Sequence, residues 1–409
     1  MTLSGRAYVG VIIAAQVLVQ IGAFALPALL PHYIDAWSLT KTEAGWLLGI
    51  FFAAYVAAVP VLMSLTDRLP ARSVYLVGSG ATALSHLGFA LLADGFWSAL
   101  VLRTLAGIGW AGCYMPGLKA IADPLAGTAQ SRAVTLHAAA VGIAGACSFL
   151  VAGFFDAVAG PRMAFLAVAL CAALAFLLAL RVMPGTPPPQ AGGPRRRLLD
   201  FRPVLANRRA MAWIAGYSVH TLEMAALRAW AVTFLALAAA RHGVPEWVPD
   251  PTVLFTAAGL LGILISITGN ESAQKFGRRR VVTIAMGGAA ILSLATGWMM
   301  EASFVLALAL VLAWNAAIYL DSSALTAGTV QAAGLGLRGA TMGLHSMLGY
   351  AGGFLGPLGV GLALDAFGDG ALGWGIGFGH IALLTLAGLA AVRVLGREPA
   401  PVAIGTPRA

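Results

Sequence analysis

The sequence predicts an all-α membrane protein in which twelve transmembrane helices form two pseudo-symmetric six-helix bundles. The chain has 409 residues, of which 60% are hydrophobic and only 10% charged, whereas soluble domains carry about 25% charged residues. Twelve apolar runs are each long enough to cross about 30 Å of hydrocarbon as a helix. Polar features also recur at a near-constant spacing in the two halves of the chain.

The apolar runs do not alternate between apolar and polar residues, which a membrane β-barrel would require. We therefore expect each run to be a helix. The expected spans cover approximately residues 8–31, 43–65, 73–93, 98–121, 133–155, 161–183, 211–238, 252–272, 281–300, 303–326, 339–364 and 373–395.

The placement of the basic residues orients these spans. The net charge of +9 could by itself suit a nucleic-acid surface. With a cytoplasmic N-terminus, however, only Lys41, Arg162 and Arg241 of the 25 Lys and Arg residues fall outside, and Arg103 and Arg228 fall within spans. This positive-inside pattern predicts a multi-pass protein of the cell inner membrane with both termini in the cytoplasm, and it argues against nucleic acid as a partner.

The first span has one feature of a cleaved signal peptide, because Ala23-Phe24-Ala25 follows an apolar stretch. Cleavage would leave eleven spans and reverse the sides of the loop charges, so we expect the span to be retained. The three cysteines all lie within spans, which favours small packing residues over disulfides or metal ligands.

The longest polar interruption, residues 184–210, is rich in Pro, Gly and Arg and is expected to be a cytoplasmic linker. It separates an N-terminal six-helix bundle over 1–183 from a C-terminal one over 211–395, with a cytoplasmic tail over 396–409. Within the linker, Arg195–Arg197 either touch anionic lipid headgroups or act as a solvated topology signal.

The two halves repeat weakly. DRLPAR (67–72) follows the second span, and QKFGRR (274–279) follows the eighth, about 207 residues later. RAVTLH (132–137) and RGATMGLH (338–345) open the fifth and eleventh spans, and Asp156 and Asp365 follow these two spans at nearly the same offset. A duplicated six-span unit accounts for the constant spacing.

These features resemble the major facilitator superfamily of secondary transporters over essentially the whole chain. The segment RTLAGIGWAGCYMPGLKAIAD (103–123) is similar to the family's fourth-span motif of an arginine, a Gly-rich run, a proline and an Ile-Ala-Asp ending. Asp67, Arg68 and Arg72 match the family's motif after span two, G-x-x-x-D-R-x-G-R-R, but Met63 and Pro70 replace its glycines. The second copy keeps Lys275, Gly277, Arg279 and Arg280, with Gln274 in place of the acid.

One departure bears on the substrate. The fifth-span Gly-Pro signature common in drug–proton antiporters is missing from GIAGACSFLVAG (142–153). The segment GGFLGPLGVG (352–361) in span eleven resembles that signature. This departure argues against multidrug efflux.

Two segments, GIGWAG (107–112) and GLGLRG (334–339), match the nucleotide-binding pattern G-x-G-x-x-G, but neither follows a predicted strand. Their glycines therefore favour close packing of helices over a nucleotide site, and we expect no cofactor.

Arg103 is a permanent cation near the start of the fourth span. A charge at the bilayer centre costs at least about 2.5–3.5 kcal/mol, so Arg103 either extends toward the outer interface or faces a water-filled cavity or a coupling carboxylate. Gly107, Trp110 and Tyr114 share its helix face, and such a face suits a polar cavity better than lipid.

Span seven carries His220, Glu223 and Arg228 near mid-depth, on the face that also holds Tyr217 and Met224. The alternatives are a static ion pair that joins two helices and a titratable or substrate-facing cluster, of which we favour the second. His220 and Met224 could also hold a soft metal such as Cu(I), with Met342, His345 and Met347 as a second loose set.

The resemblance implies that spans one, four, seven and ten line the central path, and all four spans contain polar residues. The expected substrate-binding and coupling residues are Gln16, Gln20, Arg103, Tyr114, His220, Glu223, Arg228, Asn315 and Tyr319. Charged residues at the cytoplasmic face are expected to form a gate, in which Asp67 accepts hydrogen bonds from the start of a neighbouring helix. The other gating candidates are Arg68, Arg72, Arg132 and Arg338.

Two buried arginines against one buried carboxylate would leave a spare positive charge in the cavity. The sequence therefore predicts a monomeric secondary transporter that moves a small organic anion or zwitterion by alternating access, coupled to protons and surrounded by membrane lipid. The alternatives are an efflux pump for amphipathic compounds and a soft-metal transporter. An enzyme is not expected, because H-E-x-x-H, G-x-S-x-G and paired-carboxylate motifs are missing from the sequence.

Overall fold

The computed structural model describes residues 5–185 and 200–396, and every regular element within these ranges is a helix. Twelve segments are long and apolar enough to cross a membrane, as the sequence predicts. The first of them, Gly5–Ala36, consists of α1 (Gly5–Gln20) and α2 (Ala25–Ala36). The other helices are α3 (Lys41–Leu65), α4 (Ala71–Leu92), α5 (Phe96–Ala122), α6 (Gly127–Ala159), α7 (Pro161–Val182), α8 (Arg202–Leu205), α9 (Arg208–His242), α10 (Pro251–Phe276), α11 (Arg278–Trp298), the 3-10 turn η1 (Met299–Glu301), α12 (Phe304–Ala332), α13 (Arg338–Phe367) and α14 (Ala371–Leu395).

The interruption between α1 and α2 is held by packing against other helices. A Cβ atom on Gly22 would collide with the His86 imidazole of α4, so only glycine lets that ring approach the chain here. The backbone N–H of Phe24 donates a hydrogen bond to Ser148 Oγ of α6 at 2.9 Å, and the Phe24 ring stacks on Phe149 at 5.6 Å. The first span is therefore bent at the depth of these contacts, which the apolar pattern of the sequence does not reveal.

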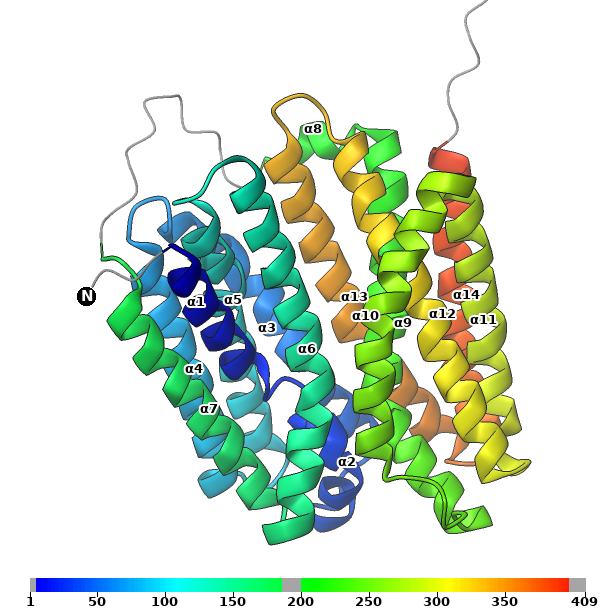
Figure 1. Ribbon diagram of the computed structural model, residues 1–409. Helices are drawn as coiled ribbons and strands as arrows, with labels where there is room; N and C mark the ends of the chain where they lie inside the picture. Colours follow the sequence, from blue (N-terminus) through cyan, green and yellow to red (C-terminus); the bar gives the residue numbers. More distant parts are fainter. Residues whose placement is uncertain (1–4, 186–199, 397–409) are drawn as a thin grey trace, which may run out of the picture.

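Six candidate spans precede residues 186–199 and six follow them, and the two sets lie side by side (Figure 1). We call the end of the molecule at which α7 ends and α8 lies the linker end, and the other the opposite end. The expected linker, 184–210, contains α8 and the first residues of α9, which the sequence analysis did not anticipate. Arg195–Arg197, and the tail after Gly396, lie outside the described residues.

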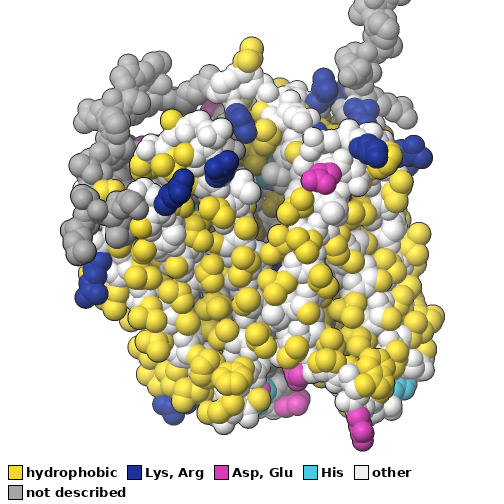
Figure 2. Space-filling model, viewed as in Figure 1, with side chains coloured by type: hydrophobic (Ala, Val, Ile, Leu, Met, Phe, Trp, Pro, Cys, Tyr) yellow, Lys and Arg dark blue, Asp and Glu magenta, His cyan; other side chains and the backbone are white. Residues whose placement is uncertain are grey.

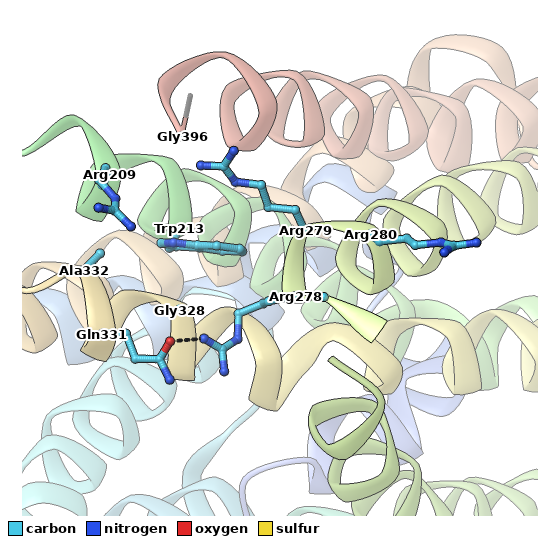
Figure 3. A pocket seen from close by; sticks show the side chains of 10 residues that line it. Arg209, Trp213, Arg278, Arg279, Arg280, Gly328, Gln331, Ala332 and Gly396 are labelled. Carbon is cyan, nitrogen blue, oxygen red and sulfur yellow. Dashed lines mark hydrogen bonds between the residues drawn. The ribbon is translucent and has the colours of Figure 1, made fainter. Parts of the chain in front are cut away.

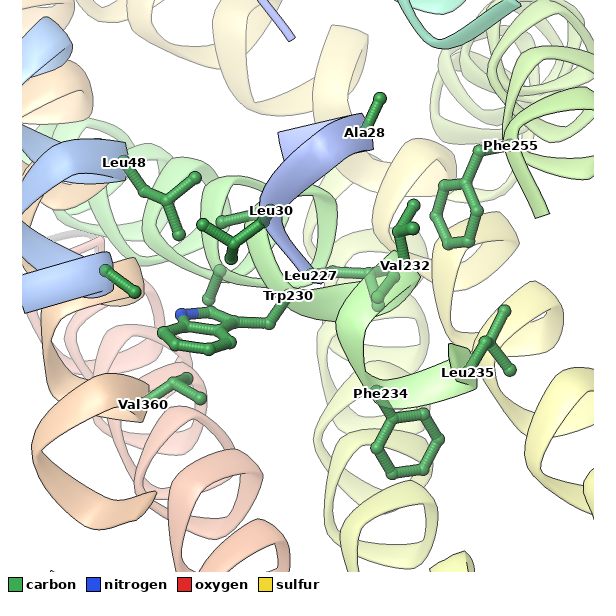
Figure 4. Close-up of a cluster of buried hydrophobic side chains, with 14 of the residues drawn as sticks. Ala28, Leu30, Leu48, Leu227, Trp230, Val232, Phe234, Leu235, Phe255 and Val360 are labelled. Carbon is green, nitrogen blue, oxygen red and sulfur yellow. The ribbon is translucent and has the colours of Figure 1, made fainter. Parts of the chain in front are cut away.

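The two halves pack against each other through α3 with α13, α6 with α10, and α2 with α9. Gly45 and Gly49 of α3 lie directly against the backbone of Pro357 and Phe354 of α13, where a side chain would not fit. The largest hydrophobic cluster continues this contact across the halves (Figure 4). In that cluster the indole N–H of Trp230 donates a hydrogen bond to the Pro357 carbonyl oxygen at 2.9 Å.

Toward the linker end the halves separate. Contacts between the halves include those of Tyr55 with Ser346, at 3.4 Å between their hydroxyl oxygens, and of Gly142 with Ile263. Figure 2 shows the surface hollowed between the two halves toward that end. Hydrogen bonds between the halves therefore lie toward the opposite end, and the surface hollow lies toward the linker end.

Candidate functional site

Arg228 lies at the junction of the two halves. Its guanidinium carbon is 5.1 Å from the ring centre of Phe24, which belongs to the N-terminal half, and 5.5 Å from the ring centre of Tyr319 on α12. Its Nη2 donates a hydrogen bond to the Tyr319 hydroxyl, and its Nη1 lies beside Gly145 of α6. No carboxylate of the described ranges lies within ion-pair distance of it. Arg228 is thus a half-buried positive charge between the halves whose contacts are aromatic rings and a hydroxyl.

Two glycines of α10 place the partner of Arg228. The Tyr319 ring lies against Gly262, where an added Cβ would overlap it, and the Tyr319 hydroxyl lies near Gly259. Without side chains at these positions, α12 packs its tyrosine flat on α10 and directs the hydroxyl toward Arg228. Asn315, one turn earlier on α12, donates to the Ala258 carbonyl oxygen at 3.3 Å and so faces α10.

Aromatic rings form a wall at the same junction. Tyr350 of α13 lies 4.5 Å from Tyr55, 5.3 Å from Trp110 and 5.9 Å from Phe52, measured between ring centres, and these three belong to the N-terminal half. Tyr114 continues the wall, 6.0 Å from Trp110. We define the aromatic wall as Phe52, Tyr55, Trp110, Tyr114 and Tyr350. It presents apolar faces together with several hydroxyl groups.

Glu223 is 2% exposed and faces the interior of the C-terminal half. Its Oε1 accepts a hydrogen bond from the Trp314 indole N–H at 2.6 Å, and its Oε2 accepts one from the Thr385 hydroxyl at 3.2 Å. Glu223 and Arg228 do not form the ion pair that was one of the two expected alternatives. The carboxylate therefore joins α9 to α12 and α14.

A second buried acid lies next to this group. Asp321 of α12 is 2.7 Å from His220 Nδ1, and both side chains are buried. The Tyr217 ring stacks on both His220, at 5.7 Å, and His345, at 3.7 Å, and His345 Nδ1 lies 3.1 Å from the Thr329 hydroxyl. Asp321 also interacts electrostatically with Glu223. We call Glu223, His220 and Asp321 the acid–histidine group.

Asp321 was not among the expected site residues, although a carboxylate inside an apolar span is itself a signal of function. Its presence corrects the expected charge balance, because the spans hold two buried carboxylates, Glu223 and Asp321, where one was expected. Those two carboxylates lie with His220 inside the C-terminal half, whereas Arg228 lies between the halves. Among the described residues, Arg228 therefore carries the unpaired positive charge at the junction.

Arg103 is 2% exposed and faces the interior of the N-terminal half. Its Nε donates to the Leu47 carbonyl oxygen at 3.4 Å, and its guanidinium lies 4.9 Å from the Phe51 ring centre. His86 is within electrostatic reach, while Nη1 has no hydrogen-bond partner among the described residues. Arg103 neither extends to an interface nor contacts Glu223, so these two expected site residues belong to separate halves.

Gln16 and Gln20 of α1 are also buried in the N-terminal half. The Gln16 side chain lies against Gly117 of α5, and Gln16 Oε1 and Nε2 and Gln20 Nε2 have no partner within the described ranges. Buried amides of this kind are normally satisfied by protein or by ordered water. Both glutamines lie in the N-terminal half, whereas the acid–histidine group lies in the C-terminal half.

The expected gating residues do not meet across the halves. Asp67 pairs with Lys119 of α5 at 3.0 Å, within the same half, and Arg72 donates to the Leu180 carbonyl oxygen at 2.6 Å. Arg68, Arg132 and Arg338 are exposed, and the described residues show no ion pair to them. The expected hydrogen bond from a neighbouring helix start to Asp67 is replaced by the Lys119 ion pair.

Comparison with solved structures shows the fold. A bacterial homologue of the human lysosomal transporter Spinster, in an inward-facing and occupied conformation, has a TM-score of 0.72 at 17% identity, covering 97% of this chain and 96% of that one. A POT family transporter in complex with 5-aminolevulinic acid has a TM-score of 0.77 at 12% identity, covering 95% and 96%. The nucleoside transporter NupG has a TM-score of 0.73 at 14% identity, covering 97% and 100%.

Comparison of sequences gives the family. The human Monocarboxylate transporter 11 is 29% identical over 278 residues, which are 58% of this chain, so the chain matches only about half (56%) of that relative's length. The sequence profile of the Major Facilitator Superfamily matches residues 12–357. The twelve spans, their division into two sets of six and this match agree, and the chain belongs to the Major Facilitator Superfamily of multi-pass membrane transporters.

Proposed function

We propose that this protein is a proton-coupled secondary transporter that moves a small organic anion across the inner membrane by alternating access. The observation that carries the proposal is Arg228, a positive charge between the halves that no described carboxylate neutralises. A carboxylate substrate would supply the missing negative charge and could bind the guanidinium in a bidentate manner. The aromatic wall would contact the apolar part of the same molecule.

The name of the relative supports the same class of substrate, because Monocarboxylate transporter 11 is named for monocarboxylates. We extend this class to the present chain only as a proposal. Under the predicted orientation the linker end faces the cytoplasm, both termini are cytoplasmic, and the described conformation would admit substrate from the cytoplasm.

The acid–histidine group supports proton coupling. Glu223, Asp321 and His220 are titratable groups buried together, where the loss or gain of a proton changes the stability of their contacts strongly. The Tyr217 ring stacks on His220 at 5.7 Å and on His345 at 3.7 Å, so a change in the protonation of this group would act directly on that ring.

The test uses purified protein in liposomes with an imposed pH gradient and a panel of radiolabelled monocarboxylates, namely acetate, lactate and pyruvate. We expect uptake of at least one of them to follow the gradient, to be lost in Arg228→Gln, and to persist in Arg241→Gln. Arg241 is the matched control because it lies on the same helix but is paired with Glu301 at the opposite end. Uptake that ignores the gradient, with Glu223→Gln transporting normally, would refute proton coupling.

The aromatic wall also favours a second candidate function, the export of amphipathic compounds, because it could hold a large apolar ring system. Under this alternative, a strain without the protein becomes more sensitive to amphipathic cations and dyes. Unchanged susceptibility together with loss of monocarboxylate uptake would exclude export in favour of the first proposal.

A further inference from the structure

His345 of α13 is a buried imidazole outside the acid–histidine group, with 3% of its surface exposed. The Tyr217 ring stacks on His345 at 3.7 Å and on His220 at 5.7 Å, and the two imidazoles interact electrostatically. Gly349, one turn further along α13, permits this packing, because a Cβ atom there would overlap the Tyr217 ring. The contact of α9 with α13 therefore holds both imidazoles on one tyrosine ring.

One nitrogen of His345 is fixed as a hydrogen-bond donor. The Thr329 hydroxyl has a single hydrogen, which it donates to the Leu325 carbonyl oxygen at 3.1 Å. The same hydroxyl lies 3.1 Å from His345 Nδ1, so its oxygen accepts a hydrogen bond from the Nδ1–H. The neutral imidazole therefore carries its proton on Nδ1. Its Nε2, to which the described residues make no hydrogen bond, is the nitrogen that can take up a second proton.

The buried titratable groups of this half follow one another in depth. Both α13 and α9 begin at the linker end, with Arg338 and Arg208 as their first residues. At a rise of 1.5 Å per residue, His345 lies about 10 Å along α13, whereas His220 and Glu223 lie about 18 Å and about 22 Å along α9. His345 is therefore the member of this series that lies nearest to the linker end.

Solvent comes close to this series at the linker end. A partly open pocket of about 530 Å³ lies there, and the described residues that line it include Trp213 of α9 and Gly328 of α12, which lie against each other (Figure 3). Trp213 is one helical turn, about 6 Å, from Tyr217, and Gly328 directly precedes Thr329. Water at the linker end therefore comes within about one turn of the tyrosine ring on which His345 stacks.

We propose that His345 carries protons between the linker end and the acid–histidine group. Its Nε2 takes a proton from water on the linker-end side and releases that proton, through water, to His220 and the carboxylates of Glu223 and Asp321. The imidazole is neutral again after each transfer, and the proton stays with the acid–histidine group. The inference rests on the proton coupling proposed above and adds to it the residue through which the proton enters.

Transport into liposomes with an imposed pH gradient tests the proposal, with radiolabelled acetate, lactate and pyruvate as probes. Two substitutions remove the titratable group: His345→Gln, whose amide can still donate to Thr329, and His345→Ala, which leaves space for a free imidazole. We expect both to slow gradient-driven accumulation about tenfold. Exchange of labelled for unlabelled acid at equal pH should be unchanged, because it needs no net release of protons. Millimolar imidazole should restore accumulation in His345→Ala but not in His345→Gln, which distinguishes a proton carrier from a packing residue.

The control is His380→Ala, which removes an imidazole of the same half that lies against Gly359 of α13. It should accumulate the probes as wild-type protein does, with or without imidazole. Unchanged accumulation in His345→Gln would overturn the proposal, and so would a joint loss of accumulation and exchange that imidazole does not restore in His345→Ala. If wild-type protein itself ignores the gradient, proton coupling is refuted. If the wild type and the His345 variants all follow it, coupling stands and the proton enters elsewhere.

Discussion

The carboxylate of Asp365, at the end of α13, accepts hydrogen bonds from the backbone N–H of Lys41 at 2.8 Å and of Thr42 at 2.7 Å, at the start of α3. These residues are more than 300 positions apart and belong to different halves of the chain. The negative charge lies at the N-terminal end of a helix, where the dipole favours it. These two hydrogen bonds therefore connect the halves at the opposite end, and they must break when that end opens.

The corresponding acid of the first half does not make the equivalent contact. Asp156 lies in the last turn of α6, as Asp365 lies in the last turn of α13, but the described residues show no hydrogen bond to the Asp156 carboxylate. The start of α10 is instead capped within its own half by Asp250, which accepts from the Thr252 backbone N–H at 2.8 Å. A cavity of about 520 Å³, lined in part by Asp156 and Asp250, lies there instead. The hydrogen bonds that connect α13 to α3 thus have no counterpart between α6 and α10 among the described residues, despite the internal repeat.

We expect Asp365→Asn to shift the protein toward conformations open at the opposite end. The bonds are exposed, so the effect should be about 0.5–1 kcal/mol, or about two- to fivefold in the conformational equilibrium. Electron–electron distance measurements between spin labels at Asp94 and Glu246, in a background without native cysteines, would report the opening. Asp156→Asn is the matched control and should leave the distance distribution unchanged; a shift of the same size in both variants would contradict this explanation.

Gly262→Ala should weaken substrate binding without removing any substrate contact. The added methyl group must displace the Tyr319 ring, and the ring carries the hydroxyl that accepts from Arg228. We expect KM for the transported monocarboxylate to rise about tenfold. Gly287→Ala is the control, because it adds the same methyl group to α11 where no atom lies within 4 Å. An unchanged KM in Gly262→Ala would show that the Tyr319 position does not set substrate affinity.

Glu223→Gln should separate proton coupling from the binding of the substrate. Glutamine can still accept from Trp314 through its Oε1 and lie beside Thr385, so the helix contacts should survive. We expect the variant to exchange labelled for unlabelled substrate across liposomes, while it no longer accumulates substrate in response to a pH gradient.

The control for this prediction is Thr385→Val, which removes a hydrogen bond to Glu223 but no titratable group. It should keep the response to the gradient. If Glu223→Gln still accumulates substrate, the proton passes elsewhere, and Asp321 with His220 becomes the remaining coupling pair of the acid–histidine group.

The architecture could be predicted from the sequence because it depends on composition over long windows. The twelve apolar runs and the repeated motifs predict twelve spans in two sets of six, and the structure and the family comparison confirm this fold; the orientation predicted from the basic loops stays a prediction. The bend after α1 could not be predicted, since it depends on the contacts of Gly22 with His86 and of Phe24 with Ser148, both distant in sequence.

The contents of the site were harder to predict, because helical periodicity shows which residues share a face but not which helix they meet. Arg103 and Glu223 were both expected near the path, yet each faces the interior of its own half. Tyr350 was not expected at all, because an isolated tyrosine in an apolar span resembles an ordinary packing residue until the aromatic wall of the other half is placed beside it.

Arg103→Met should make the protein more stable and less active. Arg103 is a buried cation whose partners are a carbonyl oxygen and an aromatic ring, and its Nη1 has no described partner. A buried charge without a counter-ion costs several kcal/mol, whereas methionine of similar length would fill the space and also contact Phe51. We expect the melting temperature in detergent to rise by a few degrees, as it would for about 1–2 kcal/mol of stabilisation.

Uptake should fall at least tenfold in the same variant if the charge is retained for transport, because a stability cost is commonly kept only where function requires it. Arg103→Lys keeps the charge but not the planar group over Phe51, and it should therefore be less stable than wild type while it keeps part of the uptake. A variant Arg103→Met that is both less stable and fully active would show that the arginine is a packing residue of the N-terminal half, held by contacts that outweigh the cost of burying its charge.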